Sequence, residues 1–279
     1  AIVGTRDGKI LKTTDGGGSW LTLLSTVNER YGNLYFHDEM HGITVTPDPF
    51  QQRKADVYGT SDGGVTWTRI GTQLAARFPI DNTLTFFDEN NGWFASSNTA
   101  GSDPAEATIF RTMDGGLSWT EVHVSAQNVV AISFADRQRG FCVDDVTGIA
   151  RRSIDGGRNW RAAFYPMNGS RNVDVQAFMG SGIVWITGDE GSWISADLGA
   201  TWKRTALSPS GALQDAVFAD TLTGWVVSKS GIVQRLRGNP LLAVRDAFPL
   251  PEGMRLDPAW PNPASGTAVM LPFALAQRE

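Results

Sequence analysis

Several features that commonly define a fold or a compartment are scarce in this chain of 279 residues. It has one cysteine, Cys142, so no disulfide can form within it and cysteine usage does not identify a compartment. Cys142 lies between Phe141 and Val143 in an apolar segment, where a lone cysteine is most often a small buried core residue. No apolar run approaches the ~18 residues that a membrane-spanning helix requires, so we expect no membrane span.

Charge and helical periodicity are also scarce. Charged residues make up 19% of the chain, the formal net charge is −5, and Lys and Arg form no run. Because nucleic-acid binders carry a basic stripe, this composition predicts no nucleic-acid partner. No segment keeps helical spacing of apolar residues over ten positions, whereas the 31 glycines and 10 tryptophans are abundant. Such a composition favours many short strands joined by glycine-rich turns.

An eight-residue pattern, here called the box, occurs five times. It consists of Ser or Thr, a spacer, Asp, a spacer, Gly, a spacer, a polar residue and Trp, and its copies span residues 13–20, 60–67, 112–119, 153–160 and 195–202. Its defining residues are Asp15 and Trp20, Asp62 and Trp67, Asp114 and Trp119, Asp155 and Trp160, and Asp197 and Trp202. The aspartates recur every 41 to 52 residues, which is typical of a repeat architecture. We expect each Asp to bond backbone amides of its own turn and each Trp to pack under the neighbouring strand, as structural devices rather than active-site groups.

A second pattern, here called the Phe-Asp turn, lies between the boxes. It consists of Phe, a spacer, Asp, three residues, Gly and a large apolar residue, and it begins at Phe36, Phe86, Phe134 and Phe218. A degenerate copy begins at Phe178 and has Gly180 in place of Asp. One repeat therefore predicts a strand that ends at Phe, a second from the Gly, a third that enters the box and a fourth that leaves it. Four strands with this period are typical of a propeller blade.

The predicted fold is an all-β propeller of six or seven four-stranded blades over residues 1–237. The first blade is incomplete, and we expect residues to be missing before Ala1. Residues 238–258 contain four prolines and predict an extended linker. Residues 259–279 predict the start of a further β module that is truncated at Glu279.

The five boxes resemble the Asp-box (BNR) repeat. Together with the segment 2–17, they are similar to the photosystem II stability/assembly factor family, over roughly residues 1–236. The resemblance implies a propeller and leaves function open, because Asp-box propellers also occur in sialidases, xyloglucanases and sortilin-like receptors.

The tail resembles the start of the C-terminal sorting domain of the type IX secretion system. The matching residues run from Trp260 to Thr267 and continue through a strand to Leu275. The resemblance implies export across an outer membrane, with the secretion machinery as a partner and an extracellular or outer-cell-surface location.

Catalytic and metal-binding patterns are weak. His37 and His41 are four residues apart, but a helical zinc site needs Glu directly after the first His, and Asp38 stands there within a Phe-Asp turn. A sialidase needs three convergent arginines and a Tyr–Glu pair. Only Arg77 faintly matches the arginine motif, and the sequence shows no recognisable Tyr–Glu pair. A xyloglucanase-like enzyme needs two propellers. We expect no catalysis, no metal and no cofactor.

A binding role remains. Boxes and Phe-Asp turns are expected at one end of the sheets, with the long loops 47–56 and 96–108 at the other. Because loops on a rigid scaffold concentrate recognition residues, the candidate binding residues are Arg30, Tyr31, Arg53, Arg77 and Arg171, unless they are ordinary solvated side chains. The sequence thus predicts a secreted, non-catalytic scaffold for a protein or glycan at the cell surface. The alternatives are a sialidase-type glycoside hydrolase and an assembly chaperone like the photosystem factor.

Overall fold

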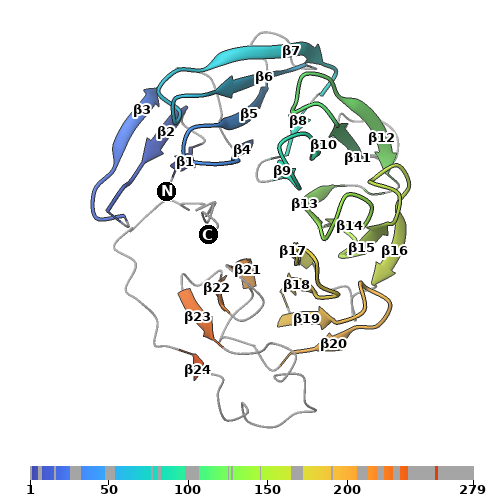
Figure 1. The fold of residues 1–279 in the computed structure, drawn as a ribbon. Helices are drawn as coiled ribbons and strands as arrows, with labels where there is room; N and C mark the ends of the chain where they lie inside the picture. The colour runs from blue at the N-terminus through green and yellow to red at the C-terminus, as the bar shows by residue number, and fades with distance from the viewer. Residues whose placement is uncertain are drawn as a thin grey trace. The chain divides into compact units, whose positions relative to one another are not determined.

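The computed structural model describes residues 2–5, 8–15, 17–25, 33–47, 54–76, 78–80, 83–97, 107–124, 126, 128–144, 146–164, 172–189, 191–205, 213–218, 223–228, 233–237 and 255–256. These residues form antiparallel strands joined by turns, which confirms the predicted all-β class (Figure 1). In this part of the chain, no helix has the length and apolar character needed to cross a membrane. The chain divides into two compact units, whose described strands are β1–β12 and β13–β24.

The first unit holds three sheets. Sheet I consists of β1 (Ile2–Gly4), β2 (Lys9–Lys12) and β3 (Leu21–Ser25). Sheet II consists of β4 (Asn33–Phe36), β5 (Gly42–Pro47), β6 (Ala55–Thr60) and β7 (Thr68–Leu74). Sheet III consists of β10 (Gly92–Ser97), β11 (Ala107–Thr112) and β12 (Thr120–Val124), with β8 (Phe78–Pro79) and β9 (Thr85–Phe86) both paired to β10. Sheet I has three described strands, in keeping with the incomplete first blade that the sequence predicts.

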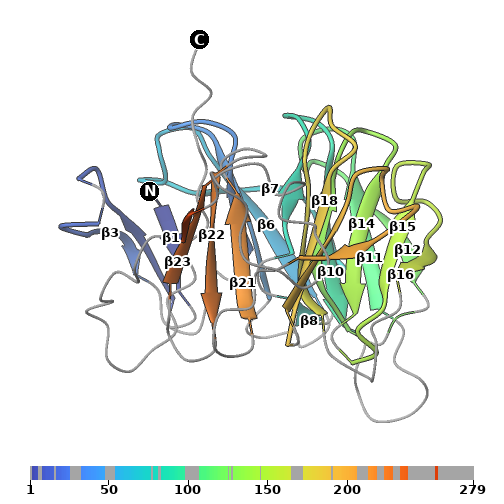
Figure 2. The same cartoon turned by 90° about the horizontal axis from the view of Figure 1, so that it is seen from below.

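The second unit also holds three sheets. Sheet IV consists of β13 (Val129–Phe134), β14 (Gly140–Asp144), β15 (Ala150–Ser153) and β16 (Arg161–Phe164), and Figure 2 shows β14, β15 and β16 side by side. Sheet V consists of β17 (Asn172–Ala177), β18 (Val184–Gly188), β19 (Gly191–Ser195) and β20 (Lys203–Arg204). Sheet VI consists of β21 (Leu213–Phe218), β22 (Thr223–Ser228), β23 (Val233–Arg237) and β24 (Arg255–Leu256).

Strand β24 differs from the sequence prediction. The sequence places Arg255 and Leu256 in the linker 238–258, whereas the structure pairs them with Arg237 and Leu236 of β23. A fourth strand satisfies backbone groups that β23 would otherwise leave unpaired at the sheet edge. Sheet VI is therefore completed from beyond the predicted propeller boundary at residue 237. The predicted sorting module, residues 259–279, lies outside the described residues.

Apolar side chains fill the space between successive sheets within each unit. Ile43 and Val45 of sheet II pack with Phe94 and Phe110 of sheet III, and Phe141 of sheet IV packs in the cluster that sheet V completes. Strands β14 and β18, the second strands of sheets IV and V, are buried along their length. Cys142 on β14 is fully buried, as predicted, and burial raises the pKa of its thiol to about 12.

The glycine of the Phe-Asp turn has a steric reason. A Cβ on Gly92 would lie 2.5 Å from the ring of Phe86, and a Cβ on Gly140 would lie 2.4 Å from the ring of Phe134. The same approach occurs at Gly42 with Phe36 and at Gly224 with Phe218. Each Phe ring thus lies on the bare Cα of a glycine near the start of the next strand. This contact explains why the pattern keeps a fixed distance between Phe and Gly.

Candidate interaction surface at the box end

Each box is closed by hydrogen bonds within its own eight residues. In the second box, Thr60 Oγ1 donates to Asp62 Oδ1 at 2.8 Å, and the amide and hydroxyl of Thr66 donate to the same carboxylate at 2.9 and 2.6 Å. The other four boxes repeat this arrangement around Asp15, Asp114, Asp155 and Asp197. In three boxes the indole Nε1 also donates to a glycine carbonyl of its own turn, at Trp67, Trp119 and Trp160.

These donors keep the box carboxylates ionised. Hydrogen bonds from the side chain and amide of Thr66 lower the pKa of Asp62 to about 2, and those from Thr201 do the same for Asp197. The bonds from Ser19 hold the pKa of Asp15 well below its usual range. The box aspartates therefore carry full negative charge at neutral pH while their oxygens are occupied by their own turn.

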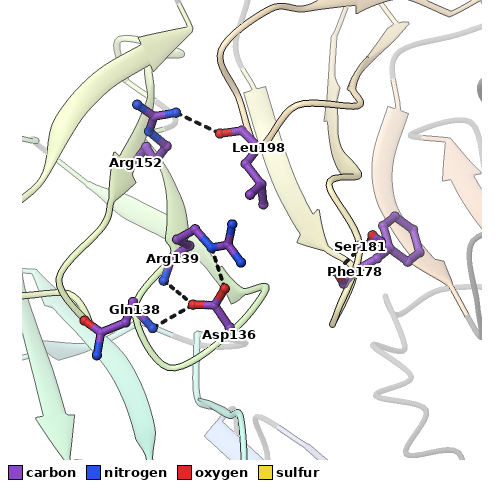
Figure 3. A network of polar contacts seen from close by, with 7 residues as sticks. All are labelled: Asp136, Gln138, Arg139, Arg152, Phe178, Ser181 and Leu198. Carbon is purple, nitrogen blue, oxygen red and sulfur yellow. Dashed lines mark hydrogen bonds and ion pairs between the residues drawn. The ribbon is translucent and has the colours of Figure 1, made fainter.

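The Phe-Asp turns close in the same way. Asp38 Oδ1 accepts the amides of Met40 and His41 at 2.7 and 2.6 Å. Asp88 accepts the amides of Asn90 and Asn91 at 3.0 and 2.8 Å. Figure 3 shows the third example, in which Asp136 accepts the amides of Gln138 and Arg139 and also binds the Arg139 side chain.

Boxes and Phe-Asp turns, including the degenerate copy, meet at one end of sheets II to V, as the sequence predicts. The Gly63 amide of the second box donates to the Met40 carbonyl at 2.9 Å, and the Gly115 amide of the third donates to the Asn90 carbonyl at 3.0 Å. Equivalent bonds join Gly156 to Gln138 and Leu198 to Gly182, at 2.8 and 2.9 Å. We call this end of a sheet its box end.

The two histidines belong to the box end of sheet II and not to a helix. The His37 amide donates to the His41 carbonyl at 2.9 Å, and His41 Nδ1 lies 2.8 Å from Asp38 Oδ2. The His37 ring packs edge-on against Tyr35 and Phe86, and burial lowers its pKa. Among the described residues, no group of His, Cys, Asp and Glu side chains is arranged to hold a metal ion.

Large exposed apolar side chains gather at the box ends. The structure describes nine of them, and all except Val146 lie in a box, in a Phe-Asp turn or its degenerate copy, or directly after a box; the eight are Trp20, Leu21, Met40, Val65, Met113, Leu117, Ile154 and Met179. Val65 and Leu117 occupy the last spacer of their boxes, and Met113 and Ile154 occupy the first. The residue pattern of the box assigns no role to these spacers. Their signal was the presence of large apolar residues in a turn whose other fixed positions before the Trp are small or polar.

The charge at the box end differs between the sheets. The residue after the turn aspartate is Glu39 in sheet II and Glu89 in sheet III, but Arg137 in sheet IV, and all three are exposed. At the last box spacer, sheet IV has Arg158 where sheet III has Leu117. Sheets II and III therefore present an acidic and aliphatic box end, and sheet IV presents arginines beside the exposed Ile154.

The fifth box departs from the others in its backbone. Leu198 has a φ of 55°, in a box position where Gly63, Gly115 and Gly156 also have positive φ. Its carbonyl accepts a hydrogen bond at 3.0 Å from Nη1 of Arg152, which links sheets V and IV (Figure 3). Its side chain packs against the apolar cluster between those sheets.

The binding residues predicted from the sequence, Arg30, Tyr31, Arg53, Arg77 and Arg171, lie outside the described residues. The structure therefore neither groups nor separates them, and they stay predictions. Among the described residues, the exposed large apolar side chains lie instead mainly at the box end, which the sequence predicts to be structural.

Comparison with known proteins identifies the fold. No protein-family model and no curated protein matches the chain. Among solved structures, the GH74 enzyme of Niastella koreensis is similar with a TM-score of 0.65 and 12% identity over 91% of this chain, which spans 43% of that enzyme. YCF48 from Cyanidioschyzon merolae is similar with a TM-score of 0.61 and 18% identity over 92% of this chain and 80% of that protein. The Dos1 propeller is similar with a TM-score of 0.59 and 9% identity over 85% of this chain and 65% of that protein. The chain therefore has a β-propeller fold that resembles YCF48 and GH74 propellers.

Proposed function

We propose that this protein is a non-catalytic β-propeller that binds another protein through the box ends of its sheets, outside the cell or at its surface. The observation that carries the proposal is the gathering of exposed aliphatic side chains at the box ends. Val65, Met113 and Leu117 are 59%, 59% and 57% exposed. Large apolar side chains that gather on the exposed surface of a protein mark interaction sites.

The chemistry of the box-end carboxylates supports a non-catalytic role. A glycoside hydrolase needs a carboxylic acid with a raised pKa to protonate the leaving group. Hydrogen bonds from their own turns instead lower the pKa of Asp38 and Asp62 to about 2. The likeness to GH74 enzymes concerns the fold, and a shared fold does not carry an activity with it.

The type of side chain favours a protein over a glycan as the ligand. Met40 and Met113 are flexible and polarisable, and methionine is common on surfaces that adapt to apolar protein segments. The scaffold that presents them is rigid, because box and turn are bonded to each other and to themselves. Recognition residues are commonly held in this way, on turns that a rigid scaffold positions.

The binding role is tested by chemical cross-linking of the purified chain to intact cells of the organism that produces it. We expect the chain to cross-link reproducibly to one surface protein, and the triple variant Val65→Ser, Met113→Ser, Leu117→Ser to lose that product. A glycan array run in parallel should show no binding. Glycan binding that survives in the triple variant, or sugar release from xyloglucan or sialosides, would contradict the proposal.

The tail resemblance supports export by a type IX-like route. The test is the location of the full-length protein in the organism that produces it, by immunoblot of cytoplasm, outer membrane and culture medium. We expect it in the medium or at the outer surface, and deletion of residues 259–279 and any following sorting module to retain it inside. A cytoplasmic location of the intact protein would contradict export.

A further inference from the structure

The box ends of sheets II and III carry an excess of negative charge. Their described turns and boxes, residues 37–41, 60–67, 87–91 and 112–119, contain six carboxylates and neither Lys nor Arg. The carboxylates are Asp38, Glu39, Asp62, Asp88, Glu89 and Asp114. Lys12 of sheet I comes close, with Nζ 3.0 Å from the point that a Cβ on Gly63 would occupy, and it offsets one of these charges. The remaining excess attracts cations over the Debye length of about 8 Å at physiological ionic strength.

The four aspartates and two glutamates contribute in different ways. The aspartates accept hydrogen bonds from their own turns, so they supply a fixed negative field and no free ligand atoms. Glu39 and Glu89 have exposed side chains, and they follow the turn aspartates directly. An incoming ammonium or guanidinium group would therefore meet the two glutamates first, against a background that the aspartates keep negative.

Aliphatic side chains are interspersed with these charges. Met40 lies on the second box, with Sδ 4.0 Å from the point that a Cβ on Gly63 would occupy. The third box lies against strand β7 of sheet II, because a Cβ on Gly71 would come within 2.3 Å of the Leu117 carbonyl oxygen. The box ends of the two sheets therefore adjoin, and Val65 and Leu117 are exposed on them.

We propose that the adjoining box ends of sheets II and III bind a protein segment that is rich in Lys or Arg and carries aliphatic side chains between them. This specifies the partner of the proposed function and rests on it. Interspersed charges set the orientation and the association rate of such a complex, and the desolvated apolar contacts slow its dissociation. Sheet IV provides the internal contrast, because the same turn position holds Arg137.

The test uses the full chain and two synthetic peptides, one of alternating Leu and Lys pairs and one with Glu in place of Lys. Binding is measured by fluorescence anisotropy at low and physiological salt. We expect the Lys peptide to bind, more weakly at higher salt, and the Glu peptide not to bind. The charge-reversed variant Glu39→Arg, Glu89→Arg should weaken binding of the Lys peptide at least about tenfold. Its turns should fold normally, since the structure already accommodates Arg137 at that position.

Two further variants separate local binding from the overall charge of the protein. The control Arg137→Glu makes the chain more negative at sheet IV and should leave the affinity for the Lys peptide unchanged within about twofold. The variant Val65→Ser, Leu117→Ser keeps every charge and should weaken binding severalfold at physiological salt, where the apolar contacts dominate. Binding that follows net charge alone, or that ignores Glu39 and Glu89, would overturn the proposal.

Failure of the proposed cationic partner and failure of the proposed scaffold function give different results. If cells yield a cross-linked partner that depends on Val65, Met113 and Leu117 while the Lys peptide does not bind, the scaffold role stands and the cationic partner is wrong. If the Lys peptide binds as predicted but no cell-surface partner cross-links, the site chemistry stands and the cellular role is wrong. If the wild type self-associates in sedimentation and Glu39→Arg, Glu89→Arg abolishes it, the occupant is a second copy and the proposal is overturned.

Discussion

The box ends of sheets II and III share their scaffold with the box end of sheet IV, yet they present different chemistry. In all three, the Phe ring covers the bare glycine, the turn Asp binds amides of its own turn, and the box Asp binds the box. Some residues between these fixed positions differ: Glu39 and Glu89 correspond to Arg137 in sheet IV, and Leu117 corresponds to Arg158, whereas Ile154 keeps an exposed aliphatic side chain in sheet IV. Fixed positions therefore make the sheet end, and spacer positions are available for recognition.

The largest expected effect comes from altering the same fixed position, the glycine of the Phe-Asp turn, in sheet III and in sheet IV. Gly92→Ala in sheet III places a methyl group 2.5 Å from a Phe ring in a buried site. Gly140→Ala in sheet IV does the same at 2.4 Å. Overpacking of this kind should lower the free energy of unfolding by about 2–3 kcal/mol in both variants. Urea denaturation measures it. A loss below about 0.5 kcal/mol in either sheet would show that the ring can move aside and that the glycine is not required.

Acid should weaken the boxes of both units. The pKa of Asp62 in the first unit and of Asp197 in the second falls from 3.8 to about 2 on folding, so each stabilises the fold above pH 3.8 and loses that effect as the pH falls towards 2. We expect Asp62→Asn and Asp197→Asn to lower the urea midpoint at pH 7, with the deficit shrinking towards pH 2. The control is Glu121→Gln, an exposed residue of strand β12 outside any box. A deficit that is constant with pH would show that the lost interaction does not depend on charge.

The repeated elements were the predictable part of the molecule. Boxes and turns close through hydrogen bonds between residues at most four positions apart, so their residue pattern alone predicted the all-β blades. Strand β24 was not predictable, because it reaches β23 across an intervening segment and two paired residues leave no local pattern. The location of the box end was predictable as well, but the exposure of Val65 and Leu117 was not, because the residue pattern does not show that these side chains point away from the turn.

Within the second unit, the fifth box holds Leu198 where the fourth box has Gly156. Both residues have positive φ, 55° and 74°, a conformation that costs a residue with a side chain about 1–2 kcal/mol. Leu198→Gly should therefore be about 1 kcal/mol more stable than Leu198→Ala, a pair that shares the loss of the packed Leu side chain. At Gly156, Ala should be less stable than Gly by a similar amount. Equal stabilities of the two Leu198 variants in thermal and urea unfolding would contradict strain at this position.

Exchange of spacer residues should have the smallest effect on stability. Leu117→Arg gives sheet III the residue of sheet IV, and Arg158→Leu makes the reverse exchange at the same box position. Both side chains are exposed, so each variant should unfold within about 0.5 kcal/mol of the wild type in urea. Leu117→Arg should nevertheless weaken binding of the Lys peptide, because it removes an apolar contact and adds a like charge. A large loss of stability in Leu117→Arg would mean that the spacer belongs to the scaffold, and the division between fixed and recognition positions would fail there.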